Sequence, residues 1–244
     1  MNLPTKFYHN RLSNIGDFIY CLFVFEDLYR KFNLKFDLRI SNAYKRNNGF
    51  CDLIAYQPYI NSCDLVENEK NISEFIEFDM INKSYEDFYA QHFVNFFKEK
   101  LNIECNYNED FKLLAPNLTE KKDIEFFTSK KIVGDRNNSL DRRRKSYVIK
   151  NSNYCKGDDY YYLTGTFPFL VDCAIIKQSE HPFHATCTGI TIIASLMDKQ
   201  IILYYDEEMN QWAKNTTKMD YTFDDFINRY LLSKTQITLI KIDE

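Results

Sequence analysis

The sequence predicts an α/β protein built as two compact halves, and three observations lead to this prediction. Short strand-like segments alternate with segments of helical periodicity along the chain. A strongly polar segment with a basic run interrupts this alternation near the middle. The 244 residues are 45% hydrophobic and 16% aromatic, which supplies ample apolar area for a real core at about 25 cal/mol per Å² buried.

The first half alternates strands and helices from its start. In order, we expect a strand at Lys6–His9, a buried helix at Gly16–Phe32, a strand at Lys35–Ile40, a short helix at Asp52–Gln57 and a strand within Ile72–Met80. The short helix stops before Pro58, since the residue preceding a proline disfavours the helical conformation.

The clearest helix of the first half spans Ser84–Leu101. Its aromatic residues recur at spacings of 3, 4, 7 and 8, and Ser84 caps it with an acid three residues later. The aromatic stripe, with His92 on it, is interpreted as core. Binding of an acceptor on this face is the alternative.

The segment 134–145, GDRNNSLDRRRK, has Leu140 as its one apolar residue and contains four consecutive basic residues at 142–145. It is the best candidate for a linker, so the expected domains are 1–140 and 146–244. A solvated loop is favoured for the basic run over contact with an anion or a membrane headgroup.

The second half starts a fresh α/β unit after the linker. We expect, in order, a strand at Ser146–Lys150, an apolar run at Phe169–Ile176, a helix at Ile190–Met197, a strand at Ile201–Tyr205 and a helix at Thr222–Ser233. The last helix opens with Thr222 and Asp225 in a capping box.

Composition excludes several classes of function. The formal charge of −4 gives no overall attraction to nucleic acid, which disfavours a nucleic-acid partner. The seven cysteines are scattered without C-x-x-C spacing, so we expect reduced thiols and neither a zinc site nor a disulfide framework. Without a signal peptide or an apolar run of spanning length, a cytoplasmic location is expected, with peripheral contact at the inner membrane face left open.

Glycine is scarce, with 6 residues in the chain, and neither G-x-G-x-x-G nor G-x-x-x-x-G-K-[ST] occurs. Gly16 and Gly189, however, each open an apolar helix, one in each half. A helix start offers free N–H groups and a positive dipole end, and glycine lets a ligand come close. For Gly16 the alternative is structural, with Asn14 as the cap and Asp17 as a capping-box acid.

Two segments carry a resemblance to a known family. Asn14–Tyr20 (NIGDFIY), and Cys187–Met197 (CTGITIIASLM) followed by Ile201–Tyr204, resemble the heptosyltransferases of glycosyltransferase family nine. The resemblance implies a GT-B-like α/β fold, two small Rossmann-like domains facing across a cleft, with the acceptor on the first and the nucleotide-sugar on the second.

The resemblance also implies site residues. Asp17, in the early GD loop, takes the role of catalytic base. The residues that it assigns to donor binding are Gly16, Asn151, Ser152, Lys156, Thr188, Gly189 and Ile190. Two departures remove polar contacts, because Cys187 stands where the family has Asp and Ile192 stands where it has His.

The chemistry of these residues is coherent without the family. An acid at position 17 can take the proton of an acceptor hydroxyl, while helix-start amides and Lys156 hold the charge of a departing nucleoside diphosphate. No D-x-D triplet is present to hold a divalent metal, so a metal-independent reaction without a cofactor is expected.

Two histidines are further candidates for the site. His9 precedes the Asp17 segment, and His184, near His181, precedes the Thr188 helix start. A structural hydrogen bond at a strand end is the alternative for His9, and a plain loop position is the alternative for His184.

We therefore expect an inverting glycosyltransferase that moves a sugar from a nucleotide-sugar donor to a glycan or glycolipid acceptor, hexosyl or heptosyl transfer in a lipopolysaccharide or capsule pathway. One alternative is a non-catalytic two-lobed protein that binds a nucleotide or a sugar. Another is a glycosyltransferase that acts on protein or DNA.

Overall fold

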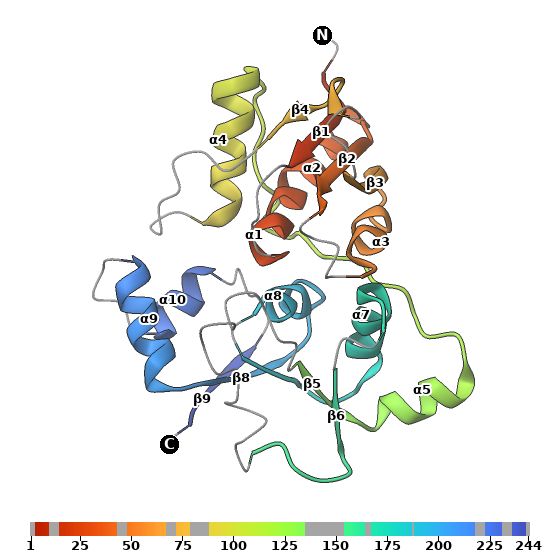
Figure 1. The fold of residues 1–244 in the computed structure, drawn as a ribbon, viewed down its shortest axis with the longest axis vertical. Coiled ribbons are helices and arrows are strands. Elements are labelled where there is room, and N and C mark those ends of the chain that lie inside the picture. Colours follow the sequence, from red (N-terminus) through yellow and green to blue (C-terminus); the bar gives the residue numbers. More distant parts are fainter. Residues whose placement is uncertain are drawn as a thin grey trace. The chain divides into compact units, whose positions relative to one another are not determined.

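The computed structural model describes residues 3–9, 15–42, 48–66, 72–78, 88–134, 154–163, 167–186, 188–217, 223–230 and 236–242. The chain divides into two compact units (Figure 1), one of Met1–Leu114 with Pro168–Leu170 and one of Ala115–Phe167 with Val171–Glu244. Each contains a parallel sheet and helices, which confirms the predicted α/β class. The division differs from the predicted boundary at residue 140, because the strand Lys131–Gly134 pairs within the second sheet.

The first unit contains a four-stranded sheet in the order β3-β2-β1-β4, with all described pairs parallel. Its elements are β1 (Lys6–His9), α1 (Ile15–Ile19), α2 (Cys21–Phe32), β2 (Phe36–Ser41), α3 (Phe50–Ala55), β3 (Ile60–Val66), β4 (Ile76–Glu77) and α4 (Tyr89–Leu101). The predicted strands at β1 and β2 are confirmed, as is the long helix, which forms α1 and α2. Strand β3 is not predicted from the sequence, because its buried residues recur at every third position instead of every second.

Phe7 of β1 lies in the middle of the first unit's core. Its ring contacts four phenylalanine rings at centroid distances of 5.3 to 6.1 Å, those of Phe25, Phe36, Phe78 and Phe97. Such pairs add about 0.5–1.5 kcal/mol each beyond their buried area. Because Phe93 and Phe97 of α4 are fully buried, the aromatic stripe of this helix belongs to the core, as predicted.

Two helices of the first unit end on asparagine. Asn33 after α2 and Asn102 after α4 adopt left-handed backbone angles, with φ of 53° and 52°. Each donates its backbone N–H to a carbonyl in the last turn of its helix, at Tyr29 and Phe97. Asparagine tolerates this conformation better than other non-glycine residues, so the helices end without using the chain's few glycines.

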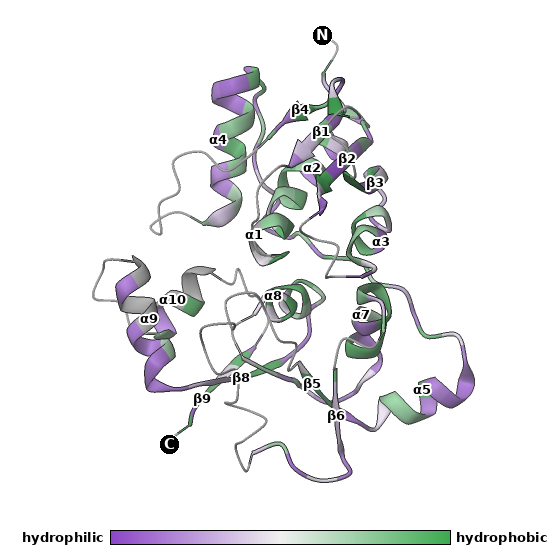
Figure 2. Cartoon of the chain, viewed as in Figure 1, coloured by the Kyte–Doolittle hydropathy of each residue, from purple (hydrophilic) through white to green (hydrophobic). Residues whose placement is uncertain are grey.

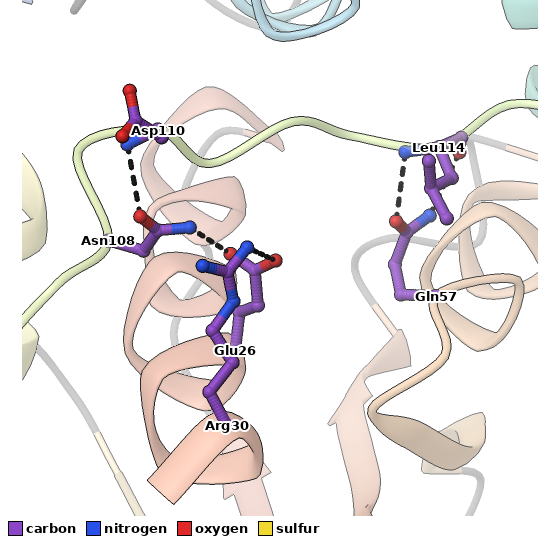
Figure 3. Close-up of polar contacts among 6 residues, drawn as sticks. All are labelled: Glu26, Arg30, Gln57, Asn108, Asp110 and Leu114. Carbon is purple, nitrogen blue, oxygen red and sulfur yellow. Dashed lines mark hydrogen bonds and ion pairs between the residues drawn. The ribbon is translucent and has the colours of Figure 1, made fainter.

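The segment after α4 runs along the first unit and is fastened by polar side chains (Figure 3). The Asn108 amide donates to the Glu26 carboxylate of α2 at 2.6 Å. Gln57, which is 1% exposed, binds the backbone of Leu114 twice: its Nε2 donates to the carbonyl and its Oε1 accepts the N–H, both at 3.0 Å. The same Nε2 also donates to the Leu53 carbonyl at 2.8 Å, so the buried amide is satisfied.

The second unit contains a five-stranded sheet in the order β6-β5-β7-β8-β9, again with all described pairs parallel. Its elements are α5 (Lys121–Thr128), β5 (Lys131–Gly134), β6 (Tyr160–Tyr162), α7 (Phe169–Gln178), β7 (Phe183–Ala185), α8 (Gly189–Leu196), β8 (Ile201–Tyr205), α9 (Glu207–Thr217), α10 (Phe223–Tyr230) and β9 (Ile237–Lys241). Helix α7 begins within the short segment that clusters with the first unit. Predicted elements are confirmed at α8, β8 and α10, and the apolar run at 169–176 forms α7.

The predicted linker lies inside the second unit instead of between the units. Its first residue, Gly134, ends β5, and residues 135–145 lie outside the described residues, as does the expected strand at Ser146–Lys150. Gly134 serves packing: a Cβ there would lie 2.4 Å from the ring Cζ of the fully buried Phe183. The glycine at the end of β5 is therefore required by the core.

Helix α8 is apolar almost all round and buried, as its sequence predicts (Figure 2). Seven of its residues are buried, from Ile190 to Leu196. A helix buried on every side is held by packing, so its first residue is fixed relative to the sheet.

Gln57 allows a test of how firmly the segment after α4 is fastened. Gln57→Ala leaves the backbone groups of Leu114 without partners, so we expect the free energy of unfolding to fall by about 1–3 kcal/mol. Urea denaturation measures this change. Gln211→Ala is the matched control, since this exposed amide binds only the Glu207 side chain among the contacts described. Equal effects of the two substitutions would contradict the fastening role.

Candidate active site

The strand order of each sheet marks one place where a ligand site is expected. In open α/β sheets, ligands bind beyond the carboxyl ends of the strands, where the chain leaves in opposite directions from two neighbouring strands. In the second unit this point lies between β5 and β7, because β5 connects outward to β6 and the chain then returns to β7. In the first unit it lies between β1 and β4.

The start of α8 lies beside this point in the second unit. Strand β7 ends at Ala185, and α8 begins four residues later at Gly189, with Thr188 as its extended N-cap (φ −137°, ψ 168°). The sequence-predicted residues Thr188 and Gly189 are half-buried, and the side chain of Ile190 is buried. Ile190 therefore has only its backbone N–H to offer a ligand. Cys187 lies outside the described residues.

Thr191 holds this helix start in place, and the sequence analysis does not single it out. Its hydroxyl donates to the Thr186 carbonyl at 2.5 Å and accepts from the Thr188 N–H at 3.4 Å. The side chain is 1% exposed. One buried hydroxyl thus joins both ends of the turn between β7 and α8. The signal in the sequence is a hydroxyl residue at the third helical position, where a capping box has Glu or Gln.

His184 belongs to a buried polar cluster. Its Nδ1 lies 2.9 Å from the Tyr204 hydroxyl and 3.7 Å from the Cys155 Sγ, and its ring stacks on Tyr204. Burial, first, and the Lys131 charge, second, lower the pKa of His184 to about 4. The imidazole is therefore neutral at pH 7 and occupied by core partners, so its contacts support a structural role instead of contact with a donor.

Lys156 lies before β6, between residues that reach both ends of the second sheet. Lys130, at the amino end of β5, donates to the Asp158 carbonyl. The Cys155 Sγ lies 3.7 Å from the His184 Nδ1, next to the carboxyl end of β7. The diphosphate role implied for Lys156 therefore stays a prediction. Asn151 and Ser152 lie outside the described residues.

In the first unit, α1 begins beyond the carboxyl end of β1, the strand beside β4. Gly16 and Asp17 both lie in α1, and Gly16 is buried. His9 ends β1 and is 1% exposed, with the rings of Phe18 and Phe78 at centroid distances of 5.3 and 5.1 Å. His9 is therefore enclosed by core aromatics, while the structural hydrogen bond expected in the alternative stays a prediction. Asn14 lies outside the described residues.

Within the described part of the chain, no group of three or more His, Cys, Asp or Glu side chains is arranged to hold a metal ion. The described helices include none that is long and apolar enough to cross a membrane.

The architecture is GT-B-like, as comparison with solved structures shows. A glycosyl transferase family 9 protein from Veillonella parvula superposes with a TM-score of 0.56 at 9% identity, covering 98% of this chain and 86% of that protein. E. coli ADP-heptose lps heptosyltransferase II gives a TM-score of 0.49 at 10% identity, over 98% of this chain and 91% of that protein. E. coli heptosyltransferase WaaC gives 0.45 at 8% identity, over 82% and 87%.

Comparison by sequence gives no relatives. No model of a protein family matches the chain, and no curated protein matches it. The likeness to known proteins therefore lies in the fold, and the predicted resemblance to the family 9 glycosyltransferases is confirmed at that level.

The lowered pKa of His184 predicts a pH dependence. The folded pKa of about 4 lies below the unfolded value near 6.5, so its stabilising contribution is complete above pH 6.5 and is lost as pH falls through 4. We expect an NMR titration of His184 with a midpoint near 4. Stability of the His184→Gln variant should fall less over this range. A midpoint near 6.5 would contradict the buried, neutral state.

Proposed function

We propose that this protein is a glycosyltransferase that moves a sugar from a nucleotide-sugar donor to a glycan or glycolipid acceptor, with inversion and without a metal ion. One observation carries the proposal: a buried helix starts with Thr188-Gly189 beside the point in the second sheet where α/β proteins bind ligands. The GT-B-like fold supports it. Placement in a lipopolysaccharide or capsule pathway follows only from the family resemblance.

On the donor side, the diphosphate binds at the start of α8. The Thr191 N–H donates to the Thr188 carbonyl at 3.0 Å, so the N–H groups of Gly189 and Ile190 are the ones proposed to bind the phosphate. The first N–H groups of an α-helix lack intrahelical partners, and the helix dipole favours negative charge there. Glycine at position 189 presents no side chain to an approaching phosphate oxygen. As the glycosidic bond breaks, these fixed donors stabilise the charge on the departing diphosphate, each worth about 3–4 kcal/mol where geometry is favourable.

On the acceptor side, Asp17 acts as the general base. It lies in α1, beyond the carboxyl end of β1 and beside the first unit's own expected ligand point. Removing the proton from the acceptor hydroxyl as it attacks the sugar contributes roughly 10²- to 10⁴-fold in rate. The assignment of this role to Asp17 rests on the resemblance of Asn14–Tyr20 to the family's early GD loop.

A specific observation favours a second candidate, a nucleotide-binding protein without turnover. Ile192, at the position where the family has His, is 2% exposed inside α8. Its side chain therefore offers a ligand neither charge nor hydrogen bond. If the family's histidine is needed for transfer, this chain binds nucleotides and does not transfer sugar.

Thr191 tests the donor site. Thr191→Val keeps the side-chain shape but removes the hydroxyl between Thr186 and Thr188, so we expect the most stabilising nucleoside diphosphate among ADP, GDP and UDP to bind roughly 2- to 12-fold more weakly. Thermal shift identifies the nucleotide, since a ligand at 100 times its Kd stabilises by about 2.7 kcal/mol. Titration calorimetry gives the affinities.

Ser195→Ala is the matched control for this experiment. Ser195 lies in the same helix, is 4% exposed, and its hydroxyl donates to the Ile192 carbonyl at 2.7 Å. Both substitutions remove a buried hydroxyl, but only Thr191 lies at the helix start. Equal losses of affinity in the two variants, or no nucleotide that stabilises the protein, would overturn the donor site.

Asp17 tests catalysis. We expect Asp17→Asn to lose transfer by about 10²- to 10⁴-fold while nucleotide affinity stays within twofold, because the base acts on the acceptor hydroxyl and not on the donor. Release of nucleoside diphosphate in the presence of a glycan acceptor measures transfer. Full activity in the variant would end the assignment. Nucleotide binding without turnover in the unaltered protein would favour the second candidate.

A further inference from the structure

Tyr154 is a large aromatic residue of the second unit that stays open to solvent. It is 46% exposed, and its ring lies against the ring of Tyr204, with the two centroids 5.8 Å apart. Leu203 of β8 is level with Ala185, the last residue of β7, so Tyr204 lies one residue beyond this end. An exposed aromatic ring is thus found at the edge of the sheet where ligands are expected.

Cys155, the next residue, fastens Tyr154 to the sheet. Its Sγ lies 3.5 Å from the Tyr204 hydroxyl and 3.7 Å from the His184 Nδ1. Its carbonyl accepts a hydrogen bond from the Tyr162 hydroxyl at 2.6 Å, and the residue is 1% exposed. Cys155 therefore contacts three strands, β6, β7 and β8. A side chain that is held in place before binding loses less conformational freedom when a ligand contacts it.

We propose that the ring of Tyr154 is the surface on which the nucleobase of the donor nucleotide stacks. This inference rests on the proposed function, because it takes the diphosphate to bind at the start of α8. It names a residue that recognises the nucleoside. Tyr154 is not among the residues that the family resemblance assigns to donor binding.

Tyr154 and the start of α8 lie on connections that leave two neighbouring strands at the same edge. Gly134, the last residue of β5, is level with Ala185, the last residue of β7. The connection from β5 to β6 contains Tyr154, and the connection from β7 to β8 contains α8. The two connections lead in opposite directions along the strand order β6-β5-β7-β8-β9. Ligands of such sheets bind between the two connections, so a nucleotide whose diphosphate contacts α8 also meets the connection that carries Tyr154.

The chemistry of the exposed ring suits the base better than the other parts of a nucleotide. The diphosphate is charged and the sugars carry hydroxyl groups, whereas a base presents a flat π face. Aromatic side chains stack on any base because every base has such a face. The contact therefore adds affinity for a nucleotide without selecting one base.

Phe126 provides a matched control in the same unit. It is exposed to the same extent as Tyr154, at 46%, but it lies in α5, which leads into the amino end of β5. It is therefore an exposed aromatic residue next to the opposite end of that strand, where no ligand is expected.

The experiment measures binding to the full chain by titration calorimetry, with the most stabilising nucleoside diphosphate among ADP, GDP and UDP and with inorganic pyrophosphate. We expect Tyr154→Ala to weaken binding of the nucleoside diphosphate by roughly 5- to 150-fold. Binding of pyrophosphate, which has no base, should stay within twofold. Phe126→Ala should leave the affinity for both ligands within twofold.

A pair of milder substitutions keeps the test valid if Tyr154→Ala folds poorly. Tyr154→Phe keeps the ring and should bind the nucleoside diphosphate within twofold of the unaltered protein. Tyr154→Leu keeps an apolar side chain without a ring and should lose affinity. Equal affinities of the Phe and Leu variants overturn the stacking role.

The outcomes separate this inference from the proposed function. If Tyr154→Ala binds the nucleoside diphosphate as the unaltered protein does, the stacking role is wrong and the proposed function stands. Equal weakening of nucleoside diphosphate and pyrophosphate also overturns the stacking role, because the substitution then disturbs the diphosphate site. If no nucleoside diphosphate binds the unaltered protein, the proposed function fails together with this inference.

Discussion

Parallel pairing is the constraint on which the rest of this structure depends. Every described strand pair in both sheets is parallel. Parallel neighbours need crossover connections, so the carboxyl ends of a sheet's strands collect at one edge and the helix starts follow them there. The orders β3-β2-β1-β4 and β6-β5-β7-β8-β9 then leave one point in each sheet where neighbouring connections diverge. The place of a ligand site is thus set by topology before any reactive side chain is considered.

Because glycine is scarce, non-glycine residues end three of the described helices. Asn33, Asn102 and Asp198 take the left-handed positions after helices that glycine often occupies. Glycine is kept where no side chain fits: Gly49 has a φ of 78° and would place a Cβ 2.8 Å from Pro168, and Gly134 lies against Phe183. A chain with so few glycines has no glycine-rich loop that could wrap a phosphate. A fixed helix start is the alternative that its sequence allows.

The elements that the sequence predicts are those whose hydrophobic pattern lies within a single segment of the chain. The apolar stretches at 190–197 and 201–205 correspond to α8 and β8. Their apolar residues alone indicate buried elements, so no knowledge of distant contacts is needed to predict them. Strands β5, β6 and β7, of 4, 3 and 3 residues, are too short to show a period. They exist because distant strands pair with them. Because β5 is not predicted from the sequence, the domain boundary predicted at residue 140 falls inside the second unit.

The candidate site likewise has one part that the sequence predicts and other parts that depend on contacts between distant segments. An apolar helix that starts at Gly189 is visible in the sequence, since the residues from 190 to 197 are apolar except for Thr191 and Ser195. The Thr191 hydroxyl bond to Thr186 is not, because it depends on the turn that brings residues five positions apart together. The cluster of His184, Tyr204 and Cys155 needs three separate segments to meet, which sequence spacing does not encode.

The alternation of side chains along β7 decides which groups can serve a ligand. Successive residues of a strand point to opposite faces, and His184 is level with Val133 on the neighbouring strand, on the face that carries Tyr204 and Cys155. Its neutral ring contacts the Tyr204 hydroxyl and the Cys155 thiol on that face. Phe183, on the opposite face, fills the space that Gly134 leaves. The side chains of the strand that leads to α8 therefore belong to the core, so the anion binding that we propose at this edge would rely on backbone amides and the helix dipole.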